Sequence, residues 1–188
     1  MILIYLLVIK DHGSFTGIRI GISTIKAFCD VTNKLCIGIT SLEGFAYKLC
    51  NMPNPDFMDK QCFPLQTANS YYICSLLNAN HGNAYCGIFK FDNGRLVQTH
   101  DYFFDSIDNI LDFVNNLQKN IFFVGNCRII LNDMIQSDKI QINPNDIISA
   151  IDIGKCAFDK YCNGLYGDSS FLTPLYLKKS SAESIGKN

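Results

Sequence analysis

The sequence has almost no net charge and lacks the common motifs that bind metals and nucleotides. Its 16 Lys and Arg residues nearly balance 17 Asp and Glu residues, which leaves a formal net charge of -1. No overall positive field therefore draws the chain to nucleic acid, and we expect another molecule to supply most contacts to RNA phosphates. Its histidines, His12, His81 and His100, form no His-x-x-x-His pair of the kind that grips zinc. Neither a P-loop nor a Gly-x-Gly-x-x-Gly motif is present.

The nine cysteines are odd in number and include no Cys-x-x-Cys pair. A zinc site needs closely spaced ligand pairs, and a disulfide framework usually has an even number of cysteines in a secreted chain. Several cysteines, such as Cys29 and Cys156, occupy apolar positions of expected helices. We therefore expect free, mostly buried thiols in a reducing cytosol, and we place the protein in the cytoplasm.

The composition is that of a globular α/β protein. Its 188 residues, 48% hydrophobic and 18% charged, suit one domain or two small lobes with a substantial core. The apolar run 1–9 has no positive segment before it and is too short to span a bilayer as a helix, so we interpret it as a buried strand.

The hydrophobic periodicity and the turn residues predict the following elements. We expect helices over 15–30, 42–50, 129–136 and from Asn143-Pro144 to Gly164, and a helix capped by Ser106. We expect strands over 71–77, 84–91, 95–102, 121–124 and 139–142 in one mixed sheet, with a tight hairpin turn at Asp92-Asn93-Gly94. The apolar residues Ile147, Ile148, Ile151, Ala157, Phe158 and Tyr161 are expected to face the core.

The segment that opens the first helix is the best candidate for a functional surface. Ser14 is placed to cap the helix, and Gly17 and Gly21 lie four residues apart on one face, so another helix could approach closely there. Arg19, one turn into the helix, could bind a carboxylate at an interface or remain a plain surface residue. The alternatives are a helix start that only serves packing, or one that holds a phosphate.

These residues carry a resemblance to a known family. Gly13-Ser14-Phe15-Thr16-Gly17-Ile18-Arg19-Ile20-Gly21 resembles the signature of the bacterial TsaB (YeaZ) proteins. Shorter similarities follow in the same order at 37–43, at 122–126 and at 174–183. The resemblance implies a two-lobed actin/Hsp70/hexokinase-like (ribonuclease H-like) fold, with lobes over 1–68 and 69–175 and a tail over 176–188. Compared with the family, the section before the signature is missing, so we expect an incomplete first lobe.

The resemblance also implies a function. TsaB proteins are non-catalytic subunits of the complex that makes threonylcarbamoyladenosine in tRNA; they pair with the catalytic subunit TsaD, and the ATPase TsaE joins them. We therefore expect no catalytic residue, metal or cofactor, partners like TsaD and TsaE, tRNA contact only through the complex, and no membrane association. A second copy of the chain is a further partner. The expected partner-binding residues are Ser14, Phe15, Gly17, Ile18, Arg19, Gly21, Ile22 and Ile25.

Two other functions remain open from the sequence. The chain could be an enzyme of the same fold superfamily, either sugar-kinase-like or glycoprotease-like, or a fragment without independent activity. An enzyme would need a phosphate loop with a catalytic Asp or a metal-binding His pair. We also expect the isolated chain to self-associate, because a missing sheet neighbour and a missing helix neighbour leave apolar surface exposed.

Overall fold

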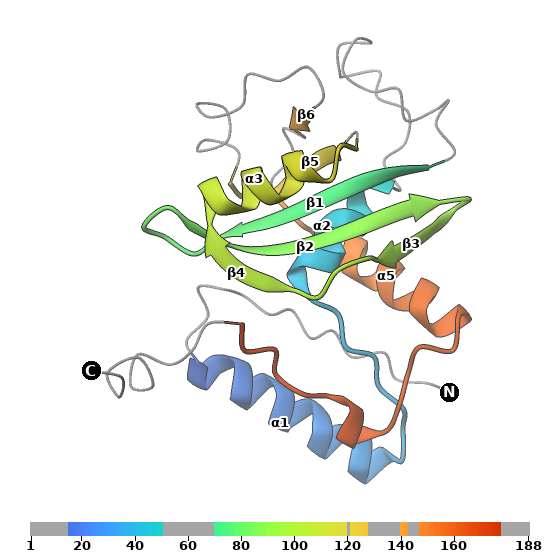
Figure 1. Ribbon diagram of the computed structural model, residues 1–188. Coiled ribbons are helices and arrows are strands. Elements are labelled where there is room, and N and C mark those ends of the chain that lie inside the picture. The colour runs from blue at the N-terminus through green and yellow to red at the C-terminus, as the bar shows by residue number, and fades with distance from the viewer. Residues whose placement is uncertain (1–14, 51–69, 120, 128–139, 143–146, 178–188) are drawn as a thin grey trace.

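A six-stranded mixed sheet forms the centre of the computed structural model, which describes residues 15–50, 70–119, 121–127, 140–142 and 147–177 (Figure 1). The strands run in the order β3-β2-β1-β5-β6, and β4 pairs with β2 beyond the end of β3. Their bounds are β1 Ser70–Asn78, β2 Asn83–Asp92, β3 Arg95–Gln98, β4 Phe103–Ser106, β5 Ile121–Gly125 and β6 Ile140–Ile142.

Strand β1 lies where the antiparallel part of the sheet meets the parallel part. It pairs antiparallel with β2, with Cys74 opposite Ile88, and parallel with β5, with Cys74 beside Phe123. The turn between β1 and β2 contains Asn80, His81 and Gly82, all with positive φ. Asn93 and Gly94 likewise have positive φ in the next hairpin, as the sequence predicts for a two-residue turn.

Helices cover both faces of this sheet (Figure 1). Alternate residues of the strands point to opposite faces, so Cys74, Leu76 and Ile88 pack against α3 (Ile107–Asn116). Tyr71, Ile73 and Leu77 point the other way, against α2 (Ser41–Cys50). Ser106 caps α3 and accepts a hydrogen bond from the backbone N–H of Asn109, as expected.

Helix α5 (Ala150–Cys162) packs beside α2 on the second face. It begins six residues later than Pro144, where the sequence predicts its start, because Ser149 and Asp152 form a reciprocal capping box. The expected core face is also partly wrong. Ile147, Ile151 and Phe158 are exposed, whereas Ala157 is buried as expected, together with Ile153 and Cys156.

The remaining differences from the predicted elements are small. The strand expected over 95–102 ends at Gln98, and residues 103–106 form the additional short strand β4. The predicted helix over 129–136 and the apolar run 1–9 lie outside the described residues. No helix among the residues that the structure describes is both long and apolar enough to cross a membrane.

Helix α1 (Phe15–Thr32) lies apart from the sheet and beside the C-terminal segment that contains the 3-10 turn η2 (Ser169–Phe171) (Figure 1). The chain connects α1 to α2 through the buried residues Ile37 and Ile39, which pack against α5. This arrangement places one long helix at the periphery of the molecule, where most of its surface is open.

Candidate functional site

One face of α1 is buried against the protein's own chain. Ile22 is only 4% exposed and packs with Cys29, Cys36 and Leu172, and Ile18 and Ile25 pack against the same cluster. These helix residues recur at spacings of three and four, which places them on one side of the helix. The cluster fixes α1 to the segment that carries η2.

The side of α1 turned away from this cluster is also apolar. Ile20 is 62% exposed and Val31 is 86% exposed, and Phe28 is exposed as well. Thr24 and Ala27, both exposed, lie between them on the helix. We call Ile20, Thr24, Ala27, Phe28 and Val31 the outer stripe. Its spacings of three and four residues are those of a helix that packs against a neighbour, so α1 has two apolar faces.

Gly17 and Gly21 lie along the edge of the outer stripe. A Cβ atom added at Gly21 would meet no heavy atom within 4 Å, so the described chain leaves open space there. Gly17 is exposed. Without side chains at these two positions, a second helix can come closer to the backbone of α1 than it could elsewhere along the stripe.

Arg19 contacts the C-terminal tail of the same chain. Its Nε donates a hydrogen bond to the hydroxyl oxygen of Tyr176 over 3.0 Å, and its guanidinium carbon lies 5.9 Å from the centre of the Tyr176 ring. The two residues are 157 positions apart in the sequence. The sequence left Arg19 as either a partner for a carboxylate or a plain surface residue. In the structure, its guanidinium contacts the phenol of Tyr176.

The structure places the expected partner-binding residues differently. Gly17 is exposed, and a Cβ at Gly21 would meet no heavy atom within 4 Å. Ile18, Ile22 and Ile25 face the protein's own core, and Arg19 contacts Tyr176. Ile22 is buried beside Leu172. Ser14 lies outside the described residues, and Phe15 is the first residue of α1, its side chain undescribed. The outer stripe was missed, although its spacing is visible in the sequence.

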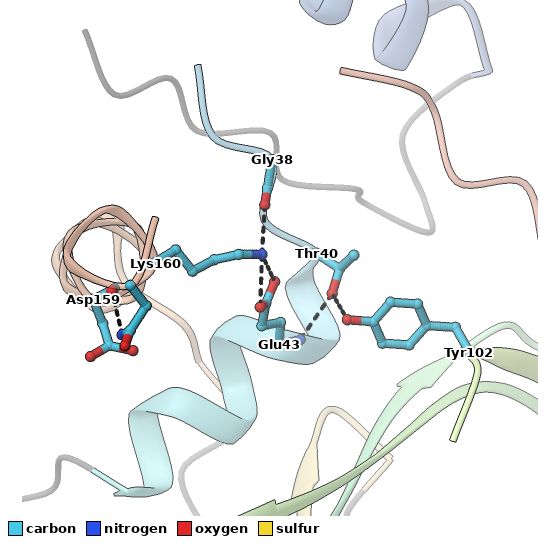
Figure 2. A network of polar contacts seen from close by, with 7 residues as sticks. Gly38, Thr40, Glu43, Tyr102, Asp159 and Lys160 are labelled. Carbon is cyan, nitrogen blue, oxygen red and sulfur yellow. Dashed lines mark hydrogen bonds and ion pairs between the residues drawn. The ribbon is translucent and has the colours of Figure 1, made fainter. Parts of the chain in front are cut away.

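A second polar arrangement joins α2 to α5. Nζ of Lys160 lies 2.9 Å and 3.0 Å from the two carboxylate oxygens of Glu43 and 2.9 Å from the carbonyl oxygen of Gly38 (Figure 2). Both charged side chains are about one-fifth exposed, at 21% and 19%. The Glu43 carboxylate is therefore held on both oxygens by one ammonium group, which leaves it poorly placed to act as a general base.

Thr40 extends this network to the sheet. Its Oγ1 accepts a hydrogen bond from the backbone N–H of Glu43, which caps α2, and it lies 3.1 Å from the hydroxyl of Tyr102 (Figure 2). A side chain at Gly87 would crowd the Tyr102 ring, so glycine there makes room for it. Burial, with the nearby charge of Glu43, raises the pKa of Tyr102. This phenol stays protonated at physiological pH and serves as a hydrogen-bonding anchor.

The cysteines in the described part are free, and most are buried, which confirms the expectation for these residues. Burial raises the pKa of Cys36 and that of Cys50 to about 12 each. Burial likewise raises the pKa of Cys74 and that of Cys156. Since the thiolate is the reactive form, these four side chains are packing groups and not nucleophiles.

Solved structures similar to this chain share its fold. A structure from Pseudomonas aeruginosa, described as an uncharacterized protein with similarity to peptidase YeaZ, matches with a TM-score of 0.66 at 14% identity, over 92% of this chain and 73% of that one. YeaZ from Pseudomonas aeruginosa matches with a TM-score of 0.59 at 14% identity, over 92% of this chain and 74% of that one. The chain has the YeaZ fold.

At 14% identity this likeness establishes the mixed α/β architecture of YeaZ and leaves the activity open. No protein-family model matches the sequence, and no curated protein matches it either. The features of the chain that bear on function are the outer stripe of α1 and the sequence signature that begins this helix.

Proposed function

We propose that this chain is a non-catalytic, TsaB-like subunit that supports a TsaD-type partner in threonylcarbamoyl transfer to tRNA adenosine. The observation that carries the proposal is the outer stripe of α1, an apolar helix face bordered by Gly17 and Gly21. The YeaZ fold and the signature at 13–21 support it. In this role α1 contributes shape and apolar area to a helix–helix interface, and the partner performs the chemistry.

The state of the polar groups supports a binding role over a catalytic one. Glu43 is neutralised by Lys160 within the fold, and the phenol of Tyr102 is used to hold Thr40. Buried thiols with a raised pKa have little thiolate at neutral pH. These groups stabilise the packing of α2, α5 and the sheet.

The finer organisation belongs to the same proposal. The two-lobed, actin-like arrangement would comprise lobes over 1–68 and 69–175, with a tail over 176–188. The partners are TsaD at α1, a TsaE-like ATPase in the same complex, and a second copy of this chain when TsaD is absent. Contact with tRNA is made through the complex, and the site of action is the cytoplasm.

The decisive experiment is a binding assay between the full chain and TsaD from the same organism. Gly21→Arg is expected to abolish binding, because a long charged side chain in the open space beside Gly21 keeps two helices apart. Ser23→Arg is the matched control, since Ser23 is exposed and lies about 100° round the helix from Thr24. Its binding should equal that of the unmodified chain. Undiminished binding of Gly21→Arg would overturn the assignment of the interface.

A further inference from the structure

The contact between α1 and the rest of the chain is narrow. Its buried face packs on Cys36 and Leu172, and among the described elements η2 is its main neighbour. The helix lies at the edge of the molecule with the C-terminal segment alongside (Figure 1). Among the described residues, the groups that contact α1 therefore influence the direction in which the outer stripe points.

The C-terminal half of α1 is anchored by the backbone that follows it. Four residues after Thr32, the backbone N–H of Cys36 donates to the carbonyl oxygen of Gly167 over 2.7 Å, and the N–H of Gly167 donates back over 3.0 Å. The Cys36 thiol also lies 3.1 Å from the carbonyl oxygen of Asp168. These bonds fix the end of α1 to the segment before η2.

In the N-terminal half of α1, Arg19 with Tyr176 adds a polar anchor to the packing of Ile18 and Ile22. The hydrogen bond and the contact between the guanidinium and the ring join the second turn of the helix to the tail, five residues after the end of η2. Arg19 lies about 140° round the helix from Thr24, the middle of the outer stripe. The pair can therefore orient this half of α1 without itself occupying the interface.

We infer that Arg19 and Tyr176 are positioning residues, which hold the N-terminal half of α1 in the orientation that presents Gly17, Gly21 and Thr24 to the partner. This inference rests on the proposed function, and it assigns to the tail a part in partner binding. A helix end that is already fixed loses less conformational freedom when the partner docks, so the pair strengthens binding without touching the partner.

The first test needs no partner. In the free full-length chain, Tyr176→Ala should speed hydrogen exchange at the amides of 20–24 about tenfold, because one charge-assisted hydrogen bond and one cation–π contact are lost. Exchange in α3 should stay unchanged. Tyr176→Phe keeps the ring over the guanidinium and should give a smaller increase. Unchanged exchange at 20–24 in Tyr176→Ala would overturn the inference, whatever the chain binds.

The second test is a double-mutant cycle on TsaD affinity. Arg19→Ala and Tyr176→Ala should each weaken binding about tenfold, and the double variant should be no weaker than the worse single one, because both remove the same contact. Strictly additive losses would contradict the inference. If the unmodified chain does not bind TsaD, the proposed function fails, and the exchange experiment still decides whether the pair positions α1.

Discussion

Lys160 on α5 neutralises Glu43 on α2 with a single ammonium group that lies within 3.0 Å of both carboxylate oxygens. The same Nζ also donates to the carbonyl oxygen of Gly38, in the segment that leads from α1 to α2. Lys160 thus joins α5 to two nearby positions, Gly38 and Glu43, that lie 122 and 117 residues earlier in the sequence. Lys160 therefore ties the segment that follows α1 to the two helices α2 and α5.

The first prediction concerns this ion pair. Lys160→Met should lower the free energy of unfolding by about 2 kcal/mol, because it leaves a mostly buried carboxylate and a carbonyl without their donor. The matched control is Lys90→Met, whose partner Asp92 is 41% exposed and lies 3.1 Å away. That change should cost less than about 1 kcal/mol in urea unfolding. Equal effects of the two changes would contradict the structural role of Lys160.

The second prediction compares two glycines. Gly125 has a φ of +113°, and a Cβ atom there would overlap the carbonyl oxygen of Leu76. Gly125→Ala should therefore cost about 4 kcal/mol or prevent folding. Gly21→Ala, in open space on a helix, should stabilise the protein by about 1 kcal/mol. Thermal unfolding of both variants checks the pair, and a well-tolerated Gly125→Ala would refute the described end of β5.

The third prediction is a loss of stability at high pH. Burial raises the pKa of Cys36 and that of Cys50 from 9.0 to about 12, so the unfolded chain releases these protons at lower pH than the folded one. The contribution of these two thiols to the free energy of unfolding is therefore fully present below pH 9 and is lost as the pH rises from about 9 towards 12. Cys50→Ala should make this fall shallower in urea unfolding at several pH values. Cys162→Ala, at an exposed position, should leave it unchanged.

The fourth prediction is self-association of the chain alone at micromolar concentration. Ile20 and Val31 on α1, with Ile151 and Phe158 on α5, expose apolar area to water. Ile20→Lys combined with Val31→Lys should shift light-scattering mass towards the monomer. A sharp monomer peak from the unmodified chain would show that these surfaces do not associate.

Local signals in the sequence were enough to predict much of the sheet. The largely apolar runs 71–77 and 84–91, with left-handed turn residues between them, predict β1 and β2, because strands covered on both faces are apolar along most of their length. The capping residue Ser106, followed by apolar residues at helical spacing, predicts α3. These predictions are correct because residue propensity, hydrophobic periodicity and the turn or capping residues favour the same structure.

Periodicity could not predict which apolar face is covered. In α1, Ile22 and Val31 belong to two apolar stripes of similar character, and the first is buried because Cys36 and Leu172 pack against it. In α5, Ile151 and Phe158 fit a helical core face as well as Ile153 and Cys156 do. The pairing of Lys160 with Glu43 spans 117 residues, so no local pattern indicates it.

The most direct test of the docking role compares two adjacent positions on α1. Thr24→Cys places a thiol in the outer stripe, and Ser23→Cys places one on another exposed side of the helix. Alkylation of each position, followed by peptide mass spectrometry, is measured with and without TsaD. We predict that TsaD slows labelling at Thr24→Cys at least about tenfold and leaves Ser23→Cys unchanged. Equal labelling of Thr24→Cys with and without saturating TsaD would contradict a docking role for this face.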